Sequence, residues 1–192
     1  MYPGKRIFDI IFSIIILMMI SPLLFLVSIL IKLDSKGTVF YRAKRVGQFG
    51  TVFNMWKFRT MISEAEIKGP SITVANDPRV TKIGKILRRT KIDEWPSFLN
   101  VLWGDMSVVG PRPESEDWVK KYSKQEEKVL LIKPGITGPS QLKYRNEEKL
   151  LSGEDWQQKY LIMMKDKLSI DLKYFAENSF LRDLKIIIKT II

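Results

Sequence analysis

The acidic pair Asp93-Glu94 and the turn Gly110-Pro111-Arg112-Pro113 are the residues of this chain best suited to chemistry. The sequence has no His and no Cys, which excludes disulfides, Cys nucleophiles, zinc ribbons and Ser-His or Cys-His nucleophile pairs. A reaction here must use carboxylates, Lys, Arg, Tyr, hydroxyl groups or a metal bound by oxygen. Two prolines fix Arg112 in a non-helical turn, which suits a guanidinium that binds phosphate, although a rigid surface turn is the simpler interpretation.

Asp93 also has a structural explanation. Acidic residues followed by Pro96 are typical of the first turn of a helix, where a carboxylate caps backbone N–H groups. On the residues alone, capping is the favoured role of Asp93. The helix would continue over Ser97–Trp103 and end at Gly104.

Positive charge is concentrated ahead of this pair. The 192 residues carry a net charge of +11, and residues 37–92 alone hold twelve basic and three acidic side chains, a surplus of nine. Such a block attracts nucleic acid, an anionic lipid surface or a phosphorylated small molecule, and charge does not choose among them.

An apolar segment precedes the basic block. Ile10–Ile31 is interrupted only by three serines and Pro22, and as a helix it would be roughly 33 Å long, enough to cross a bilayer. It is too long for a cleaved signal peptide. Pro22 should kink or break the helix, and Ser21 could bond the carbonyl freed at Met18. The more basic downstream flank places the C-terminal part in the cytoplasm. A kinked span and a hairpin that returns both fit these residues, and the span is favoured on physics alone.

The remainder predicts an α/β chain that is mostly helical. Thr38–Tyr41 and Thr51–Met61 have strand composition and flank a turn at 46–50, which indicates a β-hairpin. A loop is expected over 62–77 and another over 133–139. Helices are expected over 78–90, 114–132 and 154–175. A final amphipathic helix, with Phe180, Leu184, Ile187 and Ile191 on one side, suits a core or a membrane interface equally.

The chain resembles the small monotopic phosphoglycosyl transferases among the bacterial sugar transferases, which move a phosphosugar from a nucleotide to polyprenyl phosphate. The resemblance covers nearly the whole chain. It rests on six elements in order: Ser21-Pro22, Lys57-Phe58-Arg59-Thr60-Met61, Asp93-Glu94 with Pro96, Gly104-Asp105-Met106-Ser107, Gly110-Pro111-Arg112-Pro113 and Pro134-Gly135-Ile136-Thr137-Gly138. The chain departs from the commoner family pattern after Gly138, where Tyr144 replaces a Gly, and this leaves the transferred sugar least determined.

The resemblance implies a role for several residues. Asp93 would be the nucleophile and Glu94 its partner at a Mg²⁺ ion. The substrate phosphates and the donor would be bound by basic and polar side chains: Arg88, Arg112, Lys57, Arg59, Lys133, Gln141 and Arg145. Asp93 would attack a UDP-sugar, release UMP and pass the phosphosugar to polyprenyl (undecaprenyl) phosphate.

The resemblance also implies a location. Residues 1–36 would be a re-entrant helix-break-helix anchor, which reverses the preference for a span. Residues 37–192 would be a catalytic domain on the cytoplasmic face of the bacterial inner membrane, held by amphipathic interfacial helices including the C-terminal one. Membrane lipid is an expected partner, nucleic acid is not, and a homo-oligomer stays open. Two rivals remain: a membrane-anchored basic module that only binds anionic lipid or nucleic acid, and an enzyme of the same fold without a covalent step.

Overall fold

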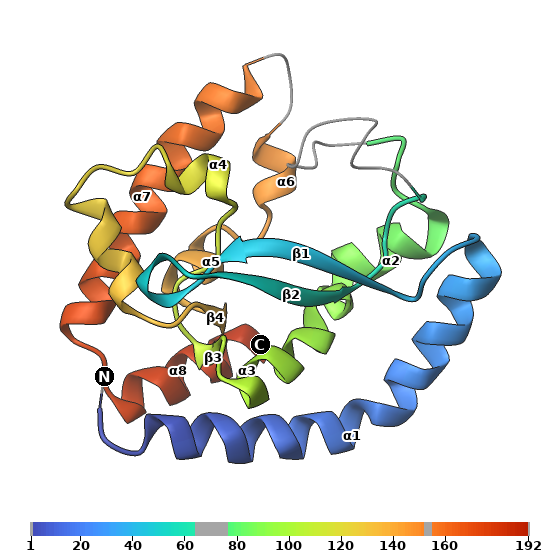
Figure 1. The fold of residues 1–192 in the computed structure, drawn as a ribbon, viewed down its shortest axis with the longest axis horizontal. Helices are drawn as coiled ribbons and strands as arrows, with labels where there is room; N and C mark the ends of the chain where they lie inside the picture. The colour runs from blue at the N-terminus through green and yellow to red at the C-terminus, as the bar shows by residue number, and fades with distance from the viewer. Residues whose placement is uncertain (1, 64–76, 152–154, 192) are drawn as a thin grey trace.

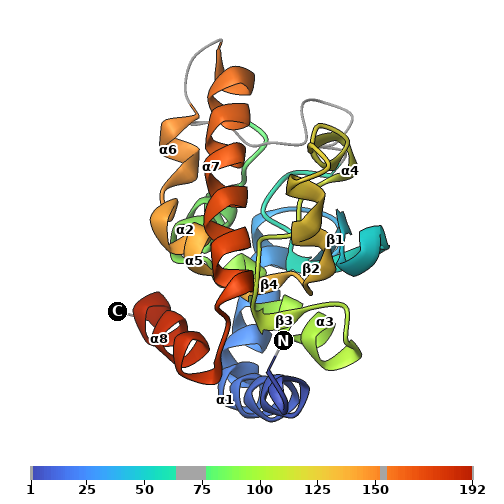
Figure 2. The same cartoon turned by 90° about the vertical axis from the view of Figure 1, so that its left-hand side faces the viewer.

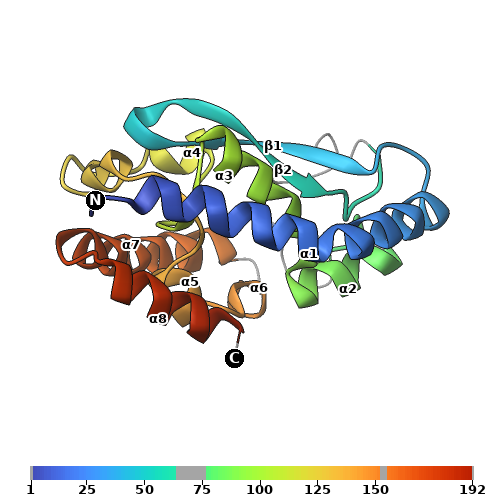
Figure 3. The ribbon, with the colours of Figure 1, turned by 90° about the horizontal axis from the view of Figure 1, so that it is seen from below.

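The computed structural model describes residues 2–63, 77–151 and 155–191. Helix α1 (Lys5–Asp34) runs along one face of a domain formed by the rest of the chain (Figures 1 and 3). By length and composition α1 could cross a membrane, and only 11% of its most apolar 18-residue window is buried. The domain combines helices with two small sheets, which confirms the predicted class.

The break expected at Ser21-Pro22 is a bend within one continuous helix (Figure 1). Pro22 has no N–H to donate to the carbonyl of Met18, and Ser21 Oγ donates to that oxygen instead at 3.0 Å. The hydroxyl therefore satisfies the carbonyl that proline leaves free, as predicted, and this allows the helix to continue.

The N-terminal end of α1 is fastened to the domain by buried polar contacts. Lys5 Nζ donates to Asp183 Oδ2 at 2.5 Å, and Asp183 is fully buried and also accepts a bond from the Tyr174 hydroxyl. One turn further, Asp9 Oδ1 accepts a bond from Val108 N at 3.0 Å. These charged residues of the apolar segment therefore face the protein.

The C-terminal end of α1 is fastened to the same domain. Arg59 donates to the carbonyl oxygens of Ser35 and Lys36, each at 2.7 Å, directly after the helix, and approaches Ile31 O in its last turn at 3.5 Å. Asp34 Oδ2 accepts a bond from Ile83 N at 3.1 Å. Both ends of the apolar helix are consequently bound to one body of protein.

The predicted hairpin is confirmed. Strands β1 (Phe40–Val46) and β2 (Val52–Phe58) are antiparallel, with Phe40 opposite Phe58 and Val46 opposite Val52, and the short 3₁₀ helix η1 (Gln48–Gly50) joins them. The first strand is longer than the predicted Thr38–Tyr41. It continues to Val46 through a basic stretch in which Ala43 and Val46 are buried, and every residue of this stretch pairs with β2.

Two helical segments follow the hairpin. Helix α2 (Lys82–Thr90) starts later than the predicted residue 78, since Thr81 Oγ1 accepts a bond from Gly84 N and forms its N-cap. The helix expected from Asp93 begins as a 3₁₀ segment, η2 (Ile92–Ser97), and becomes α3 at Phe98–Trp103. It ends at Gly104, as predicted. The loop expected over 62–77 lies mostly outside the described residues.

The single helix predicted over 114–132 is wrong. Two short pieces occupy this range, α4 (Glu116–Val119) and the 3₁₀ helix η3 (Glu126–Leu131). The physical reason is a capping box. Ser123 N donates to Glu126 Oε2 at 2.7 Å while Glu126 N approaches Ser123 Oγ at 3.4 Å, and this reciprocal pair starts a new helical turn.

The loop predicted over 133–139 contains a strand. Strand β4 (Gly135–Thr137) pairs in parallel with β3 (Ser107–Val109). The approach is close: a Cβ on Gly135 would lie 2.1 Å from Gly110 N. Only glycine fits at this position. The glycines that predict a loop here are therefore required by the close packing of a strand.

Four helices complete the chain: α5 (Pro139–Lys143), α6 (Glu147–Leu150), α7 (Trp156–Ala176) and α8 (Phe180–Ile191). The long helix predicted over 154–175 is confirmed by α7. Figure 2 shows α7 rising through the domain and α8 lying at its base beside α1. On α8 the side chains of Asp183, Ile186 and Ile187 are buried, whereas Leu181 and Ile191 are exposed.

Candidate active site

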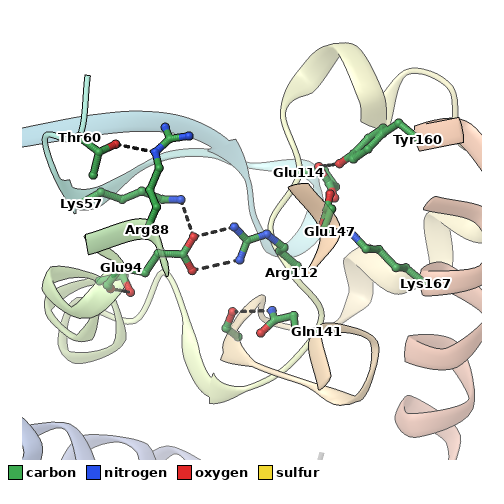
Figure 4. Close-up of polar contacts among 12 residues, drawn as sticks. Lys57, Thr60, Arg88, Glu94, Arg112, Glu114, Gln141, Glu147, Tyr160 and Lys167 are labelled. Carbon is green, nitrogen blue, oxygen red and sulfur yellow. Dashed lines mark hydrogen bonds and ion pairs between the residues drawn. The ribbon is translucent and has the colours of Figure 1, made fainter. Parts of the chain in front are cut away.

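The predicted acidic pair lies where η2 passes beside strand β2. Lys57 comes from β2, Glu94 from η2 and Arg112 from the rigid turn after β3, and the three side chains point toward one another (Figure 4). Lys57 Nζ donates to Glu94 Oε1 at 2.8 Å. Arg112 donates to both Glu94 oxygens, at 2.6 Å and 3.0 Å. The prolines around Arg112 thus hold a guanidinium fork in bidentate geometry.

Glu94 is a buried, fully paired carboxylate. Burial alone would raise its pKa, but the nearby charges of Arg112 and Lys57 outweigh this effect and hold the pKa of Glu94 well below its usual range. Burial lowers the pKa of Lys57, opposed by Glu94. The Glu94 charge raises the pKa of Arg112. The Glu94 carboxylate is therefore ionised at neutral pH and is held between Lys57 and Arg112.

Asp93 differs sharply from its neighbour. It is also buried, with 8% of its surface exposed, yet its Oδ1 has no hydrogen-bond partner among the described residues. This oxygen caps no backbone N–H, so the capping role is not observed for it. Burial, followed by the Glu94 charge, raises the pKa of Asp93 to about 6, against the lowering effect of Lys57, Arg88 and Lys91. The carboxylate is ionised for the most part at pH 7.

Arg88 reaches this region from α2 and is held by Thr60. Arg88 Nε donates to Thr60 Oγ1 at 2.8 Å. The two elements are in tight contact, because a Cβ on Gly84 of α2 would lie 2.1 Å from Thr60 O. Thr60 lies inside the motif Lys57-Phe58-Arg59-Thr60-Met61, but the motif alone does not indicate that it holds Arg88.

Asn100 is a second residue whose role the sequence analysis missed. Its fully buried side-chain amide accepts a bond from Trp56 N at 2.9 Å and donates to Asn54 O at 2.8 Å and to Asp105 Oδ2 at 3.0 Å. The amide pairs with the edge of β2 as a neighbouring strand would. It therefore sets the position of Lys57, the next residue of that strand, relative to the helix that follows Glu94.

The arrangement of an unpaired carboxylate beside a cationic cluster suits chemistry on phosphate esters. Comparison with known proteins points the same way. Residues 2–192 match the model of the family described as "Bacterial sugar transferase". The chain belongs to this family.

Individual relatives agree with the family model. The UDP-glucose:undecaprenyl-phosphate glucose-1-phosphate transferase of Escherichia coli is 39% identical over 191 residues, which cover 97% of this chain but only 39% of that protein. The exopolysaccharide production protein PSS of Rhizobium leguminosarum is 37% identical, over 98% of this chain and 93% of its own. The exopolysaccharide production protein ExoY of Sinorhizobium fredii is 34% identical, over 98% and 84%. The chain thus spans well under half of the E. coli relative.

In this member of the family, three other residues predicted to bind substrate lie elsewhere. Arg59 bonds the end of α1, as described above. Arg145 Nη2 donates to Lys189 O at 3.1 Å and Thr190 O at 2.6 Å, at the end of α8. Lys133 Nζ would lie 3.7 Å from a Cβ on Gly104, at the end of α3. Their assignment to substrate stays a prediction.

Gln141, by contrast, faces the cluster. Its Nε2 approaches Gly135 O at 3.4 Å, below Arg112 in Figure 4. Its helix, α5, begins over the buried Asp171, whose Oδ2 accepts a bond from Ser140 Oγ at 2.7 Å. Burial raises the pKa of Asp171 to about 7, opposed by the Ser140 bonds.

A cavity of about 30 Å³ lies behind Arg112, between the hairpin turn and α7. Polar residues line it, among them Glu114, Ser140, Lys167 and Asp171. Glu114 accepts a bond from Tyr160 and Lys167 donates to Glu147 (Figure 4). The volume admits a water molecule and excludes a sugar ring.

The residues present are compatible with Mg²⁺. No group of three or more carboxylates is found in the described part of the chain, but Mg²⁺ is commonly bound by one or two carboxylates together with substrate phosphates and water. The buried Oδ1 of Asp93 has no partner and offers one such oxygen. Glu94 would offer a second one by exchanging a bond from Lys57 or Arg112 for the metal ion. Binding of Mg²⁺ by this pair stays a prediction.

Proposed function

We propose that this protein transfers a sugar 1-phosphate from a UDP-sugar to undecaprenyl phosphate through a covalent intermediate on Asp93. The observation that carries the proposal is the buried Asp93 carboxylate. One of its oxygens has no partner, whereas the neighbouring Glu94 carboxylate is bonded to both Lys57 and Arg112. Membership of the sugar transferase family and the activity for which the E. coli relative is named support the same reaction.

In the first half-reaction, Asp93 Oδ1 attacks the phosphorus that bears the sugar. A new bond forms from carboxylate oxygen to phosphorus, the anhydride bond breaks, and UMP leaves with the electron pair. The ionised carboxylate needs no general base for this step, which agrees with the absence of His. Arg112 and Lys57 offer positive charge to the phosphate oxygens, as does Arg88.

In the second half-reaction, an oxygen of undecaprenyl phosphate attacks the same phosphorus. The bond to Asp93 breaks, so the carboxylate is regenerated and the product is a lipid diphosphate sugar. Glu94 and the substrate phosphates would together hold the divalent ion, which would supply positive charge to the attacking and leaving oxygens.

We also propose that α1 is re-entrant and that the domain lies on the cytoplasmic face of the inner membrane. Both ends of α1 are bound to one domain, Lys5 at one end and Asp34 at the other. A span would have to place those ends on opposite sides of the bilayer. The basic residues beyond α1 favour the cytoplasmic side.

The covalent mechanism is tested by incubating the protein with Mg²⁺ and a UDP-sugar labelled in the sugar, without acceptor. We expect UMP release and stable label on the protein, both abolished in Asp93→Asn. If the wild type turns over with acceptor but never becomes labelled, the chemistry is a direct transfer and the covalent step is wrong. If no UDP-sugar gives UMP even with acceptor, the activity itself is wrong, and the binding module becomes the better interpretation.

Topology is tested separately. A tag at Met1 should be protected from proteases in intact cells and become accessible only after lysis. Accessibility from outside would contradict the re-entrant helix without affecting the proposed chemistry.

A further inference from the structure

An exposed aromatic patch lies on the hairpin face opposite Lys57. Trp56 and Arg42 are register partners on β2 and β1, and Arg42 Cζ lies 4.5 Å from the centre of the Trp56 ring. Trp103, the last residue of α3, meets Trp56 edge to face at 5.9 Å, and Phe40 meets it at 5.6 Å. We call these four residues the Trp103 patch. Trp103 is 60% exposed, so its indole is open to contact from outside the domain.

The patch borders the N-terminal end of α1. Arg6 donates to the carbonyl oxygens of Val101 and Leu102, immediately before Trp103. Gly104 follows, and a Cβ placed there would lie 3.4 Å from Arg6 Nη2 and 3.7 Å from Lys133 Nζ. Figures 1 and 3 show α3 alongside α1. The patch therefore adjoins two cations and the exposed apolar surface of α1.

We infer that the Trp103 patch, together with Lys133, is a contact surface for the headgroup region of an anionic bilayer. Indole rings prefer this region because one edge is polar and the body apolar. Arg42 and Lys133 supply charge complementary to lipid phosphates. The patch is continuous with the exposed side of α1, where Ile7 is 64% exposed. The inference rests on the proposed location of α1 in the membrane.

This contact would give the domain a second attachment to the surface. The apolar helix holds the protein in the bilayer, and the patch binds the hairpin to the lipid headgroups. Since Lys57 projects from the other face of the same hairpin, the attachment also fixes how the site is oriented relative to the membrane.

The absence of cysteine permits a direct test with single-cysteine probes. The full chain is labelled with a nitroxide at Trp103→Cys, at Phe25→Cys on exposed α1, or at Lys128→Cys on η3, and reconstituted into phosphatidylcholine–phosphatidylglycerol vesicles. We expect the Phe25 probe to be deepest and the Lys128 probe to be fully accessible to a water-soluble nickel complex. The Trp103 probe should lie between, protected several-fold relative to Lys128.

A second measurement keeps Trp103 in place. Lipids brominated near the headgroup should quench wild-type tryptophan fluorescence more than that of Trp103→Phe. The double variant Arg42→Gln/Lys133→Gln should also reduce this quenching. Each charge removed should lower the affinity of the patch for anionic lipid by up to about fivefold. The matched surface variant Lys124→Gln/Lys128→Gln should not.

The outcomes separate this inference from the membrane proposal. If the Phe25 probe is buried while the Trp103 probe is as accessible as the Lys128 probe, the patch does not contact lipid and the inference is overturned. If the Phe25 probe is itself accessible to water, the membrane location of α1 is wrong, and the inference falls with it.

Discussion

The buried carboxylate of Asp171 should make stability fall as pH rises. Its pKa is about 7 in the fold and about 3.9 in an unfolded chain. The folded state therefore binds the proton more tightly than the unfolded one. The stabilisation is fully present below the unfolded pKa and is lost as pH rises through about 7.

The magnitude follows from these two values. Between pH 5 and pH 8 the folded protein gives up a proton that the unfolded chain has already lost, and this removes about 2.5 kcal/mol of stability. For a chain of this size, that corresponds to a fall in the melting temperature of roughly 5–10 °C. Asp171→Asn is neutral at every pH and should lack this component, while still accepting the bond from Ser140.

The assay is thermal unfolding of the purified protein in detergent, measured from pH 5 to pH 8 for wild type and variant. Asp166→Asn is the matched control on the same helix. That carboxylate is exposed and bonded to Lys143 and Tyr144, and those bonds lower its pKa. Its loss should leave the wild-type slope intact. If the melting temperatures of wild type and Asp171→Asn change with pH by the same amount, Asp171 is not protonated in the fold and the reasoning from burial is refuted.

Three further predictions concern the site. Asn100→Leu removes three hydrogen bonds to part-buried partners and should cost about 2 kcal/mol or more in unfolding free energy; a loss under about 1 kcal/mol in denaturant titration would contradict the strand-like role of the amide. Thr60→Val should lower kcat/KM for the donor by about tenfold, one lost hydrogen bond to a charged group, whereas Thr60→Ser keeps the acceptor for Arg88 and should retain activity; equal loss in both would indicate a packing role. Arg112→Lys keeps the charge but loses the bidentate fork to Glu94, so UMP release should fall by about a hundredfold or more; near-normal release would show that the fork is dispensable.

The elements that sequence patterns predicted well are those with strong local signals. The apolar run gave α1, the proline-flanked Arg112 was fixed as expected, and α7 followed its periodicity. Strand β4 was missed because its glycines serve a contact with Gly110, 25 residues earlier, that no local pattern records. The broken 114–132 segment, by contrast, carried a readable signal in Ser123 and Glu126.

The site shows the same division. Asp93, Glu94 and Arg112 came from motifs and proved to be neighbours. The contacts of Arg59 and Arg145 with helix ends could not be foreseen, because the carbonyl groups that they contact are distant in sequence. The contribution of Asn100 was hidden for a similar reason: an asparagine in a short helix has no distinguishing pattern until the strand beside it is known.

The fastening of α1 has a consequence for the order in which the protein assembles. Lys5 precedes its partner Asp183 by 178 positions, and Asp9 precedes its partner Val108 by 99 positions. During synthesis Asp9 therefore lacks its partner until Val108 has been made, and Lys5 lacks its counter-charge until α8 has been made. Closing so long a loop is slow. Docking of α8 is thus the step that fastens the N-terminal end of α1, and a chain truncated before Asp183 would leave a buried lysine without its counter-charge.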